Sequence, residues 1–149
     1  MVRETVRIFL GVLLLGAAGT DLLWRRIPNG LIIAGLSAFA ALAFCLHRQR
    51  DTALLISCLA AGTAAFALHL IPYLYKSMGA GDVKLASVIG LLLGWEGWLG
   101  YLTAYCAVAF TVSGLLLLAG KRKVKSLPLA PVMTAAYLLY CLHPFRFGS

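Results

Sequence analysis

Two of the five acidic residues, Asp21 and Asp82, each lie at one end of a long apolar run. A carboxylate this close to hydrocarbon is costly, so it is a candidate functional residue by default. Two carboxylates that approach each other share a proton, because both cannot easily ionise together. The ionised member can take a proton from a water molecule while the neutral member donates to the carbonyl oxygen of an amide. If Asp21 and Asp82 meet, they can hydrolyse a peptide bond without a metal ion and would titrate as one unit.

The segment around Asp82 reads Gly79-Ala80-Gly81-Asp82-Val83-Lys84. Gly79 and Gly81 permit positive φ and let a substrate backbone approach closely. Asp82 is expected at the N-cap of a helix that begins at Val83, where free backbone N–H groups point toward its carboxylate. The pattern thus predicts a carboxylate held by a tight turn at a helix start.

Each of these residues also has a simpler structural interpretation. Asp82 can act only as a helix cap, and Asp21 can be an acid at a helix end that pairs with Arg25 four residues later. Lys84 can be a basic anchor at the membrane surface, and Pro28-Asn29 can be a turn with no catalytic part.

The elements that must position the two acids are apolar. The chain has 149 residues, of which 62% are hydrophobic and only 12% charged, against about a quarter charged in soluble domains. The sequence therefore predicts an all-α polytopic membrane protein, one domain over residues 1–149 with six transmembrane helices. The expected spans are Thr5–Trp24, Leu31–Leu46, Thr52–Tyr75, Val83–Trp95, Trp98–Gly120 and Leu127–Leu142.

The fourth expected span, Val83–Trp95, is short. At 1.5 Å per residue it is about 20 Å long, less than the ~30 Å of a hydrocarbon core. Either the bilayer is thinned locally, or the helix starts below the membrane surface and carries Asp82 to some depth. Glu96-Gly97 is the expected turn into the next span.

The basic residues predict an orientation. Six spans place both termini on one side, and the loops that flank Asp21 and Asp82 carry more positive charge than the other face, which points them toward the cytoplasm. The basic residues on the predicted cytoplasmic face are Arg25, Arg26, Lys76, Lys84, Lys121, Arg122, Lys123 and Lys125, and those on the opposite face are Arg3, Arg7, Arg48, Arg50 and Arg146.

Several function classes are disfavoured. No basic face carries interleaved aromatic residues, so the expected partner is membrane lipid and not nucleic acid. No CxxC pair exists, so we expect no zinc site, disulfide framework or other cofactor. The cysteines, expected as small buried apolar side chains, are Cys45, Cys58, Cys106 and Cys141.

The remaining polar and aromatic residues of the spans have ordinary interpretations. His69 lies within an apolar run and is expected to be a packed, hydrogen-bonded histidine. The aromatic residues expected at the membrane interfaces are Tyr73, Tyr75, Trp95, Trp98 and Tyr101.

Both acid-bearing segments resemble one known family. Asp21 is followed by Arg25-Arg26-Ile27-Pro28-Asn29, and Gly79-Ala80-Gly81-Asp82-Val83-Lys84 is followed by Leu85. Together these motifs are similar to those of the type IV prepilin peptidases, which are GxGD-type membrane aspartic peptidases. The resemblance covers essentially the whole chain, with Pro131 matching a proline common in the last helix.

The resemblance implies roles for particular residues. Asp21 and Asp82 would be the catalytic pair, Gly79 and Gly81 would shape the loop, and Lys84, Pro28 and Asn29 would support it. Members of the family cleave the basic leader from prepilins and pilin-like proteins after a glycine, on the cytoplasmic side of the bacterial inner membrane. Larger members also methylate the new N-terminus through a segment with CxxC motifs. This sequence contains no CxxC motif, so we expect cleavage without methylation. The compact form is similar to the peptidases of tight-adherence (Flp-type) pilus systems.

Two other functions remain open from the residues. A small transporter could use the two acids as a proton relay, although Asp21 ends the first helix of its half and Asp82 begins the first helix of the other, so the halves do not correspond as inverted repeats do. A non-catalytic assembly partner could retain the motifs for folding. The substrate and the oligomeric state do not follow from the sequence.

Overall fold

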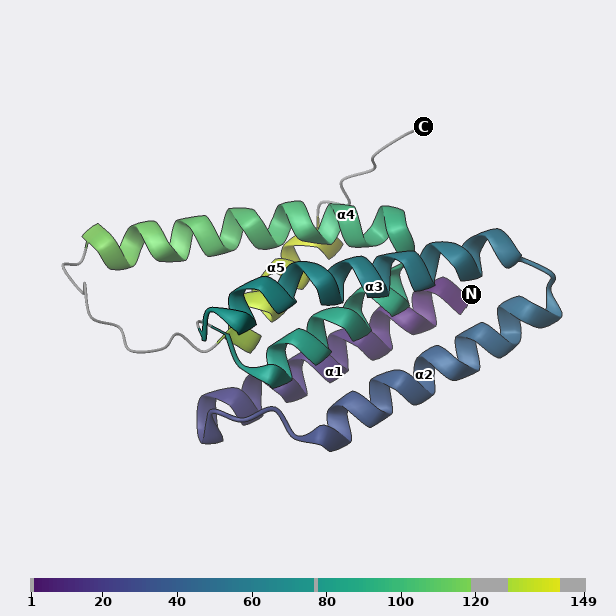
Figure 1. Ribbon diagram of the computed structural model, residues 1–149, viewed down its shortest axis with the longest axis horizontal. Coiled ribbons are helices and arrows are strands. Elements are labelled where there is room, and N and C mark those ends of the chain that lie inside the picture. Colours follow the sequence, from purple (N-terminus) through teal and green to yellow (C-terminus); the bar gives the residue numbers. More distant parts are fainter. Residues whose placement is uncertain (1, 77, 119–128, 143–149) are drawn as a thin grey trace.

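The computed structural model describes residues 2–76, 78–118 and 129–142, and this part of the chain is built from helices. The helices are α1 (Val2–Trp24), α2 (Asn29–Arg48), α3 (Thr52–Leu74), α4 (Ala80–Leu118) and α5 (Leu129–Leu142), arranged as a bundle (Figure 1). The prediction of an all-α protein is confirmed. Pro28, with φ −63° and ψ 137°, separates α1 from α2 where the Ile27-Pro28-Asn29 segment predicted a break.

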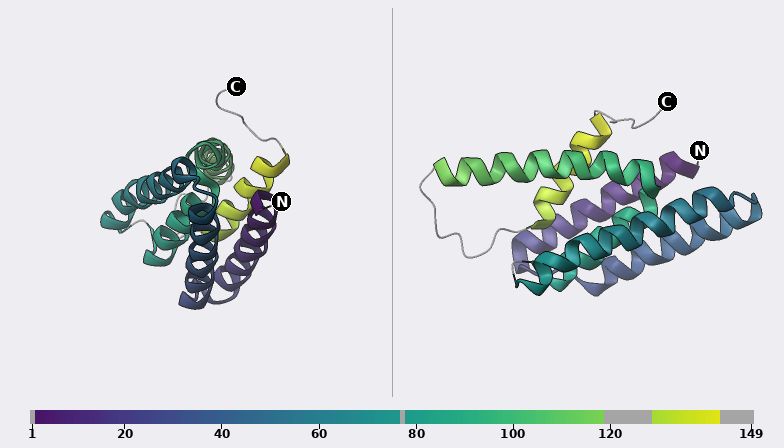
Figure 2. Two further views of the ribbon diagram at one scale, coloured as in Figure 1. Left: turned by 90° about the vertical axis from the view of Figure 1, so that its right-hand side faces the viewer. Right: turned by 45° about the horizontal axis from the view of Figure 1, so that its top comes forward.

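Helix α4 is interrupted at Gly94, whose φ of 70° and ψ of 177° are not helical. This combination is open essentially to glycine alone. The backbone N–H of Trp95 donates to Ser57 Oγ of α3 at 2.9 Å, which satisfies an amide that the break releases. The chain reverses at this point, so the later part of α4 runs back across the bundle (Figures 1 and 2). The predicted turn at Glu96-Gly97 is therefore wrong, because both residues are helical and the reversal comes earlier.

The predicted number of six spans is not confirmed. Four helices of the described part are long and apolar enough to cross a membrane, and α5 is a shorter apolar helix. The outer surface is apolar, as a bilayer requires: Ile8, Val12 and Leu15 of α1 are exposed, whereas Leu10 and Leu14 on its other face are fully buried. The several long apolar helices identify a membrane protein.

Helices α3 and the first part of α4 pack with their backbones in close contact. A Cβ added to Gly90 would lie 2.6 Å from the carbonyl oxygen of Ala61, and one added to Gly62 would lie 2.5 Å from the side chain of Leu91. Ser87 Oγ donates to the carbonyl oxygen of Gly62 at 3.1 Å. We call this contact the α3–α4 seam; it depends on small residues at the crossing.

Helices α1 and α5 also lie side by side (Figure 2). Thr134 Oγ1 of α5 donates to the carbonyl oxygen of Leu14 at 3.0 Å, and the Tyr137 hydroxyl donates to that of Arg7 at 2.7 Å. This contact, the α1–α5 seam, is joined by long-range side-chain hydrogen bonds rather than by close backbone approach.

Some side chains lie where the sequence did not place them. Cys58 is buried as expected, but Cys45, Cys106 and Cys141 are exposed on their helices. Trp98 and Tyr101, expected at a membrane interface, are buried in the core. The reversal at Gly94 explains why both aromatic side chains are buried, because it turns the later part of α4 inward onto α5. There the Tyr101 hydroxyl donates to the carbonyl oxygen of Met133 at 3.5 Å.

Candidate active site

Asp21 lies at the C-terminal end of α1 and is only 8% exposed. Its Oδ2 accepts a hydrogen bond of 3.2 Å from the backbone N–H of Ala130, in the first turn of α5. The first N–H groups of a helix have no partner within it, and the N-terminal end favours an anion. Asp21 therefore supplies a partner to a helix start 109 residues later in the chain.

Ala130 was missed by the sequence analysis, because its contribution is a backbone amide that carries no side-chain signal.

The end of α1 is set by the backbone directly after Asp21. The N–H of Arg25 donates to the Asp21 carbonyl oxygen at 2.9 Å, and Arg25 then takes a positive φ of 51°, which ends the helix directly after the acid-bearing turn.

Asp82 lies in the first turn of α4 and is half-buried. Its Oδ2 accepts a hydrogen bond of 3.2 Å from the N–H of Gly79, and its own N–H donates to the Gly79 carbonyl oxygen at 3.2 Å. The predicted N-cap position is wrong: Asp82 is the third residue of α4, and its side chain reaches back to the residue before the helix, as in a capping box.

Gly79 and Gly81 are needed for the space that they leave and not for an unusual backbone conformation. Gly94 is the glycine with positive φ among the described residues, so Gly79 and Gly81 do not adopt the positive φ that they permit. A Cβ on Gly79 would lie 3.1 Å from Asp82 Oδ2, and one on Gly81 would lie 3.2 Å from Cβ of Ile27. Gly79 thus leaves room for the carboxylate, and Gly81 lets the segment after α1 pack against α4.

The two carboxyl groups come from separate helices whose ends meet, because Ile27, just after α1, lies against Gly81, the residue before Asp82. The fold therefore brings Asp21 and Asp82 to the same end of the bundle. The other predicted residues, Lys84, Pro28 and Asn29, are exposed, and no hydrogen bond or ion pair in the described ranges links their side chains to either carboxyl group.

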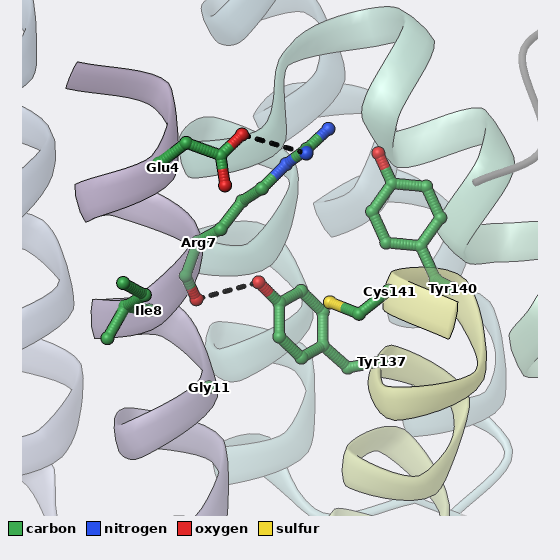
Figure 3. A pocket seen from close by; sticks show the side chains of 7 residues that line it. All are labelled: Glu4, Arg7, Ile8, Gly11, Tyr137, Tyr140 and Cys141. Atoms are coloured by element: carbon green, nitrogen blue, oxygen red, sulfur yellow. Dashed lines mark hydrogen bonds and ion pairs between the residues drawn. The ribbon is translucent and has the colours of Figure 1, made fainter. Parts of the chain in front are cut away.

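A cavity of about 330 Å³ lies elsewhere, between the start of α1 and the end of α5 (Figure 3). Arg7 and Glu4 form an ion pair of 3.3 Å at its edge. Asp21 is 14 residues beyond Arg7 on the same helix, or about 21 Å away. The residues that line the cavity are Glu4, Arg7, Ile8, Gly11, Tyr137, Tyr140 and Cys141, so it contains neither aspartate.

Comparison with known proteins adds an independent finding. Comparisons with curated proteins and with solved structures found no match. The family model of the type IV leader peptidase family matches residues 8–120, which include both aspartates and both acid-bearing motifs. This chain therefore belongs to the type IV leader peptidase family.

Proposed function

We propose that this protein is an aspartic endopeptidase that removes the leader peptide from type IV, Flp-type prepilins and pilin-like proteins. The observation that carries the proposal is that Asp21 and Asp82 lie at the same end of the bundle, where the segment after α1 packs against the first turn of α4 and a Cβ on Gly81 would lie 3.2 Å from Cβ of Ile27. Such a pair holds one shared proton and has the composition of an aspartic dyad.

The chemistry follows from the two carboxyl groups. The ionised carboxylate takes a proton from a water molecule, and the resulting hydroxide equivalent adds to the carbonyl carbon of the scissile amide. The neutral carboxyl group protonates the carbonyl oxygen, and the collapse of the tetrahedral intermediate returns a proton to the leaving nitrogen. Asp82, being half-buried, remains open to water and substrate, whereas Asp21 is fixed by the Ala130 amide.

The substrate class fits the position of the pair. A basic leader followed by an apolar helix would lie at the cytoplasmic interface, and the leader would meet the negative charge of the dyad. Cleavage after a glycine fits because glycine helps to unwind the substrate.

The proposed topology is a single domain in the inner membrane of a bacterium. The two parts of α4 on either side of Gly94, together with α5, would supply the crossings beyond α1, α2 and α3. This arrangement places the termini outside and the aspartates on the cytoplasmic side, in agreement with the basic residues near them. A transporter that relays protons through the two acids is the alternative, and the family match favours the peptidase.

The test is leader removal by the purified full-length protein in liposomes, with a prepilin substrate followed on a gel. Asp21→Asn and Asp82→Asn should each lower kcat/KM by at least about 1,000-fold, because either change destroys the shared proton. Asp51→Asn is the matched control: Asp51 is an exposed cap of α3 that accepts from the Leu54 amide at 3.1 Å, a role that asparagine retains. Near-normal cleavage by either site variant would overturn the proposal.

A further inference from the structure

The register of the α3–α4 seam brings His69 to the level of the first turn of α4. Ser57 bonds to Trp95, and Ala61 and Gly62 lie against Gly90, so the two helices run antiparallel in a fixed register. Moving seven residues forward from Gly62 reaches His69, and moving seven residues back from Gly90 reaches Val83. The imidazole of His69 is therefore level with the first turn of α4, which carries Asp82.

The reversal at Gly94 places Tyr105 at the same level. Asp82 is 12 residues before the break and Tyr105 is 11 residues after it, so both lie about 17 Å from it along their helices. A ring contact agrees with this placement, because the rings of His69 and Tyr105 have centroids 5.9 Å apart. Three helical segments thus bring an acid, an imidazole and a phenol into one layer.

The two rings are held from behind. His69 is buried, and its Nδ1 lies 2.8 Å from the carbonyl oxygen of Ala65. A carbonyl oxygen only accepts, so Nδ1 carries the proton and the ring orientation is fixed. On its other side Tyr105 stacks on Tyr101 with centroids 6.2 Å apart. These contacts fix the Tyr105 ring without using its hydroxyl.

The hydroxyl of Tyr105 differs from those of its neighbours in the core. Tyr101 donates to the carbonyl oxygen of Met133 and Tyr137 to that of Arg7. Within residues 2–76, 78–118 and 129–142, no hydrogen bond uses the Tyr105 hydroxyl, and the side chain is only half-buried. The Tyr105 hydroxyl is therefore a donor with no hydrogen-bond partner in the part of the chain that the structure describes, at the level of Asp82.

A peptide that is unwound for cleavage needs such a donor. Unwinding exposes backbone carbonyl groups that were paired within the substrate helix, and away from water each of them requires a new partner. The apolar helix of α4 continues past Tyr105 to Leu118, with Phe110, Leu115 and Leu118 exposed. The apolar part of α4 therefore continues beyond the layer, so an unwound peptide there also lies beside apolar surface.

We propose that Tyr105, oriented by His69, is a substrate-binding residue whose hydroxyl donates a hydrogen bond to a backbone carbonyl of the unwound peptide beside the scissile bond. This inference rests on the proposed peptidase function. The bond forms only once the substrate has unwound, so it contributes to kcat more than to KM.

The test is Tyr105→Phe in the full-length protein, assayed for leader removal in liposomes. Loss of the hydroxyl should lower kcat about tenfold, the effect of one hydrogen bond, with KM changed less than about twofold. Tyr101→Phe is the matched control, because it removes the hydroxyl of the stacked neighbour, which bonds to Met133 instead; its kcat should stay within about twofold. Equal losses in the two variants, or an unchanged kcat in Tyr105→Phe, would overturn the inference and leave only aromatic packing.

The orienting role of His69 has its own measurement. His69→Phe should lower kcat in the same direction, and combining it with Tyr105→Phe should add little further loss, because both changes remove the same interaction. Additive losses would contradict that role. If Asp82→Asn abolishes cleavage while Tyr105→Phe does not slow it, this inference fails and the peptidase function stands; if the aspartate variants stay active, both proposals fail.

Discussion

The two aspartates are positioned by two regions built on different principles. The α1–α5 seam holds Asp21 through a hydrogen bond from the N–H of Ala130, and Thr134 joins the same two helices by donating to the carbonyl oxygen of Leu14; in both pairs the partners are more than 100 positions apart. The α3–α4 seam carries Asp82 on a helix whose backbone lies against Gly62, and the carboxylate itself accepts a hydrogen bond from Gly79 in its own turn. The hydrogen bond of the Asp82 carboxylate thus forms within its own turn, whereas the Asp21 carboxylate gains its hydrogen bond only when α5 docks.

The difference indicates how each region should fail. A seam that depends on close backbone contact has no flexible side chain that can move aside for an added atom, so one added methyl group should cause a large loss of stability. A seam held by separate hydrogen bonds should weaken by one bond at a time. Three substitutions test this comparison.

The largest effect is expected from Gly90→Ala in the α3–α4 seam. The new Cβ would lie 2.6 Å from the Ala61 carbonyl oxygen and 3.0 Å from the Gly62 Cα, so the helices must separate. We expect a loss of about 2–3 kcal/mol in the free energy of unfolding, with most of the cleavage activity lost as Asp82 moves. Chemical denaturation in detergent and the leader-removal assay measure the two effects.

Gly114→Ala is the control for Gly90→Ala, because it makes the same change on α4 where an added Cβ meets nothing within 4 Å. It should be neutral or stabilise the helix by up to about 1 kcal/mol. Equal stability of the two variants would show that the α3–α4 seam is not closely packed.

An intermediate effect is expected from Thr134→Val in the α1–α5 seam. Valine has nearly the same shape but loses the hydrogen bonds to the carbonyl oxygens of Leu14 and Ala130, at 3.0 and 2.8 Å. The free energy of unfolding should fall by about 1 kcal/mol, and kcat should fall a few-fold as α5 loosens around Asp21. Thr111→Val provides the comparison, since the exposed Thr111 hydroxyl bonds only within its own helix. A Thr134 variant as active and stable as the Thr111 variant would contradict the prediction.

The smallest effect is expected from Tyr137→Phe, at the far end of the same seam. It removes the 2.7 Å hydrogen bond to the Arg7 carbonyl oxygen beside the cavity of Figure 3. We expect at most about 1 kcal/mol of destabilisation and no change in kcat, because Arg7 and Asp21 are about 21 Å apart on α1. A fall in kcat as large as that of Thr134→Val would show that the seam responds as one unit.

The helix borders near the site were predictable because their signals are local. A long apolar run ends at Trp24, Pro28 excludes helix before it, and α2 begins at Asn29. The same local signals placed Asp21 and Asp82 at helix ends. Family membership followed from two short motifs that the family model also covers.

The reversal in α4 was not predictable in the same way. Gly94 lies in an apolar run beside Gly90, Gly97 and Gly100, and nothing local distinguishes it from them. The more polar Glu96-Gly97 pair was the stronger turn signal. The structure favours Gly94 because Ser57, on another helix, is placed to accept the released amide of Trp95.

By itself the sequence determined that the chain is a bundle of apolar helices with two acids at helix ends, because composition and spacing along the chain set those features. Only the tertiary structure decided that Ala130 binds Asp21, that Gly94 folds α4 back, and that His69 and Tyr105 reach the layer of Asp82. The physical reason is that these features are hydrogen bonds of backbone amides and contacts that are set by the register between packed helices. Such contacts depend on how helices far apart in the chain dock, and they leave no pattern of side chains to be read in advance.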